Sequence, residues 1–168
     1  MITDVQVEAL ERVLRELLIE HESLVELARR HREALRKADG ELVTTVSLER
    51  DAVNERIVRL NEERVRVTSA IAAAVGGDAK QMTVRAVIQA VAPERADRLA
   101  SLADRLRQAV EATRREHSIL RDATAAFAGH LDGVLHRAIE MCAPSRTYTN
   151  RGRVAVSSPM PGALDVRH

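Results

Sequence analysis

Residues 7–38 read VEALERVLRELLIEHESLVELARRHREALRKA, and this stretch decides the fold. Its apolar positions follow one another at alternating steps of three and four residues. This spacing places them on one face of a helix and repeats every seventh residue, as in helices that pack against other helices. We therefore expect a long amphipathic helix from Asp4 to Ala38. The members of its seam are Val7, Leu10, Leu14, Leu17, His21, Leu24, Ala28, His31, Leu35 and Ala38.

The ends of this helix carry suitable capping residues. Thr3 or Asp4 can serve as the N-cap, because a short side-chain oxygen accepts a hydrogen bond from a free amide of the first turn. At the other end, Asp39 and Gly40 predict a stop or a kink, since glycine tolerates the left-handed conformation in which many helices end.

A second helix is expected over residues 41–75, because the same three-four stepping continues there. Two arginines interrupt its seam, and their aliphatic stems can cover apolar surface while the charged heads reach water. Gly76 and Gly77 form the clearest break in the sequence. The seam consists of Val43, Val46, Val53, Ile57, Leu60, Val67, Ile71 and Ala74, interrupted by Arg50 and Arg64.

Two further helices follow the glycine pair. A short one over residues 83–91 begins at the capping residue Thr83, and a long one over residues 93–142 starts with Pro93, which suits a first helical turn. Between Ala123 and Gly133 the long helix is rich in alanine and glycine, so it either packs loosely there or waits for a partner. Its stripe reads Leu99, Leu102, Leu106, Val110, Thr113, His117, Leu120, Thr124, Phe127, Leu131, Val134 and Ala138.

The architecture predicted from these segments is an all-α, antiparallel bundle of three long helices plus one short helix over residues 1–142. Its first part is a helical hairpin over residues 4–75. From residue 143 to residue 168 prolines and glycines replace the periodic pattern, and four arginines stand against one aspartate. Such a composition favours a disordered, flexible C-terminal tail.

Composition excludes several classes of protein. Hydrophobic residues make up 45% of the chain and aromatic residues only 1%, which suits helix packing better than a ligand pocket. The 26 basic and 25 acidic residues are mixed along the helices, so no basic face is available for nucleic acid. The sequence contains no run of about 18 apolar residues, so no membrane span is predicted. The single cysteine, Cys142, argues for a reducing compartment and so for a cytoplasmic protein.

The residue patterns of helical metal and catalytic sites are missing. There is no Glu-x-x-His or His-x-x-x-His pair, so we predict no metal and no cofactor. Cys142 lies near His136 without a third residue to orient the pair, so we predict no catalytic residues and no enzyme. His21 and His31 are interpreted as polar positions within a packed seam. The cluster Arg29 to Arg32 alternates with glutamates and predicts a salt-bridged surface.

The order of these features resembles the FlgN family, the chaperones of flagellar type III export in the bacterial cytoplasm. The similarity covers about residues 5–153. Its most specific part is the tail segment from Thr147 to Arg153, in which Tyr148 precedes Gly152. The other matching residues are Arg32, Ala34, Leu35 and Asp39 at the end of the first helix, Leu42, Val46, Glu49 and Arg50 in the second, and Leu99, Leu102, Leu106, Leu120 and Arg121 in the last.

The resemblance implies a chaperone of hook-associated proteins, which join the flagellar hook to the filament. It would hold their C-terminal helical segment before export and deliver them to a component of the export gate. A cargo helix needs apolar anchors at helical spacing. We expect them to be Leu120, Phe127, Leu131 and Leu135, and by similarity we expect Tyr148 to contact the export gate.

Two other functions fit the sequence. The unbroken heptad from Val7 to Ala38 is also typical of a structural coiled-coil protein or oligomeric scaffold, which would form a rod-like oligomer through this seam. An enzyme with an unrecognised site in the bundle is the third possibility, although no motif motivates it.

Overall fold

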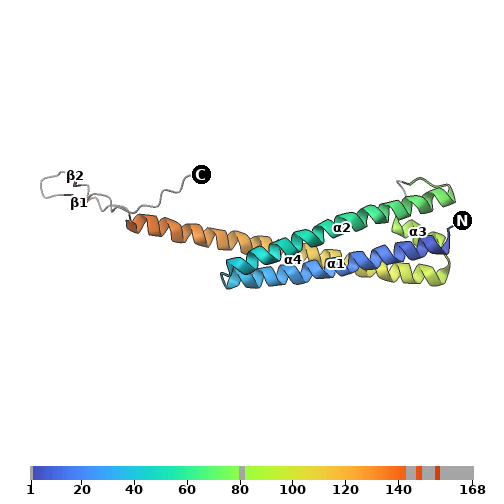
Figure 1. Cartoon of the computed structure of the whole chain (residues 1–168), viewed down its shortest axis with the longest axis horizontal. Coiled ribbons are helices and arrows are strands. Elements are labelled where there is room, and N and C mark those ends of the chain that lie inside the picture. The colour runs from blue at the N-terminus through green and yellow to red at the C-terminus, as the bar shows by residue number, and fades with distance from the viewer. Residues whose placement is uncertain (1, 80–81, 143–146, 149–153, 156–168) are drawn as a thin grey trace. The chain divides into compact units, whose positions relative to one another are not determined.

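The computed structural model describes residues 2–79, 82–142, 147–148 and 154–155. The chain divides into two units, Met1–Ala125 and Ala126–His168, and the longest helix belongs to both. Figure 1 shows the first unit as a set of long helices lying side by side, with one short helix at the end where the chain begins. Each unit is described below on its own.

Helix α1 (Asp4–Arg36) begins with a capping box. The backbone amide of Gln6 donates to Thr3 Oγ1 at 3.4 Å, and the amide of Thr3 donates to Gln6 Oε1 at 3.0 Å. Two amides that lack a partner inside the helix are thereby satisfied. Of the two predicted N-caps, Thr3 is the one that the structure uses.

The turn after α1 differs from the prediction. The residue in the left-handed conformation is Ala38, at φ 53°, and not Gly40. The helix ends at Arg36, and the amide of Asp39 returns to the carbonyl of Ala34 at 3.0 Å. Asp39 then serves as the N-cap of the next helix, because its Oδ1 accepts from the amide of Leu42 at 3.0 Å. Gly40 therefore starts a helix and does not end one.

Helix α2 (Gly40–Val75) runs antiparallel to α1, as the ion pairs between the two helices show. It ends at Gly76, whose φ of 69° only glycine adopts at little cost. The amide of Gly77 then donates to the carbonyl of Ala72 at 2.9 Å, which closes the last turn. The ion pairs join Arg12 to Glu63 at 2.6 Å, Glu20 to Arg56 at 2.7 Å and Arg30 to Glu49 at 2.6 Å.

Two more helices complete the first unit. The short helix α3 (Val84–Ala90) is capped by Thr83, as predicted, through a 3.2 Å bond from the amide of Ala86. Helix α4 (Pro93–Cys142) has the predicted bounds. Its first part runs in the same direction as α1. The contacts that set this direction are Arg95 with Asp4 at 3.2 Å, Thr113 with the carbonyl of His21 at 3.2 Å and Arg32 with Glu116 at 3.0 Å.

The apolar core of the first unit consists of two clusters. The first contains residues from all four helices, and the second contains residues from α1 and α2 only. Val7, Leu10 and Leu14 of the α1 seam lie in the first cluster and Leu24 lies in the second, so these positions are covered within the chain. The first cluster is Val7, Leu10, Leu14, Ile71, Val87 and Leu99; the second is Leu24, Leu27, Val46 and Val53.

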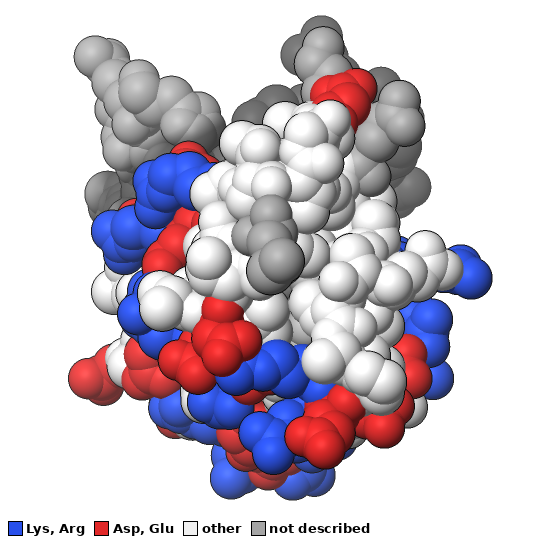
Figure 2. Space-filling view, turned by 90° about the vertical axis from the view of Figure 1, so that its right-hand side faces the viewer, with Lys and Arg blue, Asp and Glu red and all other residues white. Residues whose placement is uncertain are grey.

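One end of the first unit, shown in Figure 2, carries a broad area of uncharged residues. Val5 in the first turn of α1 is 74% exposed, and Val75 in the last turn of α2 is 43% exposed. Below this surface, positive and negative side chains alternate, and neither sign forms a patch in this view.

The all-α prediction is confirmed for the helices, in both their number and their order. Within the predicted tail the structure describes four residues, and there the strand β1 (Thr147–Tyr148) pairs antiparallel with the strand β2 (Val154–Ala155). Thr147 stands opposite Ala155, and Tyr148 stands opposite Val154. The remaining residues of the predicted tail lie outside the described part of the chain.

Candidate functional site

An exposed apolar strip lies on the last part of α4. Leu131, Val134, Leu135 and Ile139 are between 51% and 59% exposed, although large aliphatic side chains normally lie in a core. They are three and four residues apart, so they share one face of the helix over more than two turns. Every residue from Ala128 to Cys142 is exposed. Within the second unit this helix therefore has an unsatisfied apolar face.

The structure separates the four predicted cargo contacts. Leu131 and Leu135 belong to the exposed strip, and Phe127 is half-buried at its beginning. Leu120 is only 5% exposed and lies in the first unit. Its side chain is taken up by packing within the bundle, so it is not part of the exposed surface. Val134 and Ile139 are strip members that the predicted set omitted, although the three-four spacing from Leu131 and Leu135 identifies them.

Charged residues of both signs border the strip. Asp132 and Arg137 are exposed beside it on the same helix, whereas Glu140 lies on the opposite side of the helix. His136 Nε2 lies 3.5 Å from Glu140 Oε1, one helical turn away, and forms an ion pair when the imidazole is protonated. A partner on this strip would therefore meet an apolar centre with a polar margin of mixed charge, the usual anatomy of a protein interface.

A polar layer joins α4 to α1 inside the first unit. Thr113 is 6% exposed, and its hydroxyl lies 3.2 Å from the carbonyl of His21 and 3.4 Å from His21 Nδ1. Burial lowers the pKa of His21, and the neighbouring His117 lowers it further. Burial also lowers the pKa of His117, with a second contribution from the charge of Arg50. Both shifts favour the neutral form of the imidazole.

A network of ions lies next to this layer. The carboxylate of Glu116, in α4, is largely buried and lies 3.0 Å from Arg32 and 3.7 Å from Arg29 of α1. His31, buried in the same region, has its pKa lowered by burial and by Arg50. The predicted salt-bridged arginine cluster is thus confirmed, and it fastens α1 to α4 as well as covering the surface.

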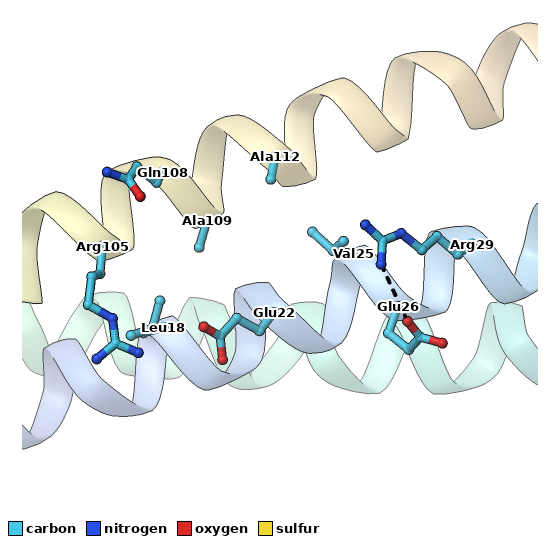
Figure 3. A pocket seen from close by; sticks show the side chains of 9 residues that line it. All are labelled: Leu18, Glu22, Val25, Glu26, Arg29, Arg105, Gln108, Ala109 and Ala112. Carbon is cyan, nitrogen blue, oxygen red and sulfur yellow. Dashed lines mark ion pairs between the residues drawn. The ribbon is translucent and has the colours of Figure 1, made fainter.

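An open cleft between α1 and α4 is shown in Figure 3. The short side chains of Ala109 and Ala112 leave space opposite Val25. Arg29 pairs with Glu26 at 3.9 Å along its edge. The side chains that line the cleft include no serine, cysteine or histidine. They are Leu18, Glu22, Val25, Glu26, Arg29, Arg105, Gln108, Ala109 and Ala112.

The described residues contain neither a group of metal-ligating side chains nor a membrane-spanning helix. Among them, no group of three or more histidine, cysteine or acidic side chains is arranged to hold a metal ion. No helix in the described ranges is both long and apolar enough to cross a membrane. Cys142 is exposed at the end of α4.

Tyr148, the predicted export-gate contact, lies in β1 opposite Val154. The backbone pairing places it in a two-stranded hairpin of the second unit. Its role stays a prediction, because only its backbone position is described.

Comparison with known proteins agrees with these features. The chain matches no curated protein and no solved structure. Residues 1–155 match the family model described as the FlgN protein. The match spans all four helices and both strands, which is most of the sequence. The chain therefore belongs to the FlgN family of flagellar export chaperones.

Proposed function

We propose that this chain binds hook-associated proteins in the cytoplasm before their export. It holds the C-terminal helical segment of such a protein against the exposed strip of α4. The observation that carries the proposal is the strip itself, in which Leu131, Val134, Leu135 and Ile139 are all more than half exposed on one helix face. Membership of a family of export chaperones supports a polypeptide as its partner.

The spacing of the strip favours a helical partner. Apolar anchors at three-four intervals are what an amphipathic helix presents and what it needs to meet. A cargo segment that becomes ordered only on binding gives up part of the interaction energy, so the complex stays weak enough to release its cargo. A carrier that must hand its cargo on requires this property.

The burial of the heptad seam removes the reason for the alternative hypothesis of a coiled-coil scaffold. Leu10, Leu14 and Leu17 of the heptad seam are at most 2% exposed within a single chain. A scaffold would need that seam to be free for a second chain, so we retain the chaperone function.

Substitution within the strip tests the proposal. Leu131→Asp or Leu135→Asp is expected to weaken binding about 10- to 100-fold, because each replaces an apolar anchor by a charge. The measurement is fluorescence anisotropy with a labelled peptide carrying the C-terminal helical segment of a hook–filament junction protein from the same bacterium. Circular dichroism checks that the helix content is largely retained.

The matched control is Leu48→Asp, which changes a leucine that is 67% exposed on α2. It is expected to leave peptide binding unchanged. Equal weakening by all three variants would mean that the peptide binds apolar surface without selectivity. Unchanged binding by the strip variants would place the cargo site elsewhere.

A second part of the proposal concerns delivery, for which we assign Tyr148 as the contact to the export gate. A tyrosine presents a large apolar area and a hydroxyl with few rotatable bonds. Tyr148→Ala is expected to spare peptide binding and to reduce secretion of hook-associated proteins by cells that carry the variant. Thr147→Ala is the control at the neighbouring position. Loss of peptide binding in Tyr148→Ala would instead make the tyrosine part of the cargo site.

A further inference from the structure

Two glycines lie within the helix that carries the exposed strip. Gly129 and Gly133 lie inside α4, in the second unit. A Cβ atom added at either position would meet nothing within 4 Å. The close approach of another chain segment, a common reason for glycine in a helix, is therefore absent from the described surroundings of both residues.

The backbone does not require glycine at these positions either. Gly76 is the glycine that adopts a positive φ among the described residues, and it ends α2. Gly129 and Gly133 have ordinary helical conformations within α4, well before its last residue, Cys142. Any residue could adopt these conformations, and alanine would do so with a higher helix propensity.

The glycines face away from the strip. Each lies two positions from Leu131, and two residues of a helix are about 200° apart around its axis. They therefore do not make room for a partner on the face that carries Leu131, Val134 and Leu135. Their remaining effect is on the stability of the helix. Each glycine lowers the equilibrium constant for helix formation about fivefold relative to alanine.

Packing does not compensate for this weakening. From Ala128 to Cys142 every side chain is exposed, whereas helices in proteins owe most of their stability to burial of one face. The segment around the two glycines is consequently the part of α4 whose helix depends most on intrinsic propensity.

We propose that Gly129 and Gly133 set the affinity for cargo by keeping this helical segment only marginally stable until a partner covers its strip. The inference rests on the proposed function. Part of the interaction energy is consumed in ordering the segment, which weakens the complex and speeds release. The glycines thus adjust how long the cargo is held, without touching it.

The test is the full-length double variant Gly129→Ala/Gly133→Ala. In the free protein, hydrogen exchange of the backbone amides of residues 127–139 is expected to slow. Binding of the labelled junction-protein peptide is expected to tighten by up to about thirtyfold, mainly through a slower dissociation rate. The reverse change, Ala126→Gly on the same exposed segment, is expected to weaken binding about fivefold.

The control is Gly40→Ala, at another helical position where an added Cβ atom meets nothing within 4 Å. It lies in α2 and is expected to change neither the exchange of residues 127–139 nor the peptide affinity. Slower exchange in the double variant without tighter binding would overturn the inference, as would unchanged exchange. A wild-type chain that does not bind the peptide would instead refute the proposed function.

Discussion

At the scale of single residues, the two left-handed positions of the helical hairpin are occupied differently. Gly76 ends α2 with a φ of 69°, and Ala38 follows α1 with a φ of 53°. The methyl group of an alanine crowds the backbone in this conformation, whereas glycine has none. The turn between α1 and α2 therefore contains local strain that the end of α2 avoids.

Exchanging the two residue types tests this difference. Ala38→Gly is expected to raise the free energy of unfolding by about 0.5 to 1 kcal/mol, because relief of strain exceeds the entropy gained by the unfolded chain. Gly76→Ala is expected to lower it by about 1 kcal/mol. Urea titration of each full-length variant measures both. A destabilised Ala38→Gly protein would show that the turn does not strain the alanine.

At the scale of elements, the contact between α4 and α1 depends on pH. The pKa values of His21 and His117 lie below the ordinary 6.5, mainly because both imidazoles are partly buried. The unfolded chain therefore binds protons that the folded chain excludes. The folded state is therefore most stable above pH 6.5, where both imidazoles are neutral in the folded and the unfolded chain. Its free energy of unfolding decreases as the pH falls below 6.5 towards the lowered pKa values.

We expect the free energy of unfolding to fall between about pH 7.5 and about pH 5.5, and the double variant His21→Gln/His117→Gln to reduce this dependence. Urea titrations across the range provide the measurement. The control is His130→Gln, which removes an exposed imidazole of α4. If the double variant retains the full dependence, another group must be responsible, such as His31, whose pKa is also lowered by burial.

The helices were predictable from sequence because periodic burial and capping are local signals. Thr3, Thr83 and Pro93 mark their starts correctly, since a cap needs only its own next turn. The turn at Ala38 was not predictable, because glycine is the default for a left-handed residue and the choice between Ala38 and Gly40 depends on where the second helix begins. Nor did α4's stripe reveal that Leu120 is buried while Leu131 is exposed, because both positions follow the same spacing.

At the scale of the whole molecule, the buried core and the exposed strip belong to different parts of the chain. Among the residues that the structure describes, all members of the buried core lie at or before Leu120, in the first unit. A chain truncated after Ala125 is therefore expected to keep its melting temperature within about 2 °C, because every fully buried apolar side chain of the core is retained. It is also expected to lose binding of the junction-protein peptide.

Thermal unfolding followed by circular dichroism, together with anisotropy, tests both parts of this prediction. Full-length protein carrying Leu131→Asp is the comparison, since it lacks the anchor but keeps the chain length. A large drop in the melting temperature after truncation would show that residues 126–168 support the bundle.

The division of the core into two clusters also bears on how the protein forms during synthesis. The cluster of Leu24, Leu27, Val46 and Val53 needs only the first two helices and adjoins their three-residue connection. The other cluster waits for Val87 and Leu99. A nascent chain leaving the ribosome can thus fold its helical hairpin before the last helix has been synthesised. Folding would start at the turn, where the contacting residues are close in sequence. The residues of the exposed strip on α4 are then synthesised after the hairpin of α1 and α2 has already begun to fold.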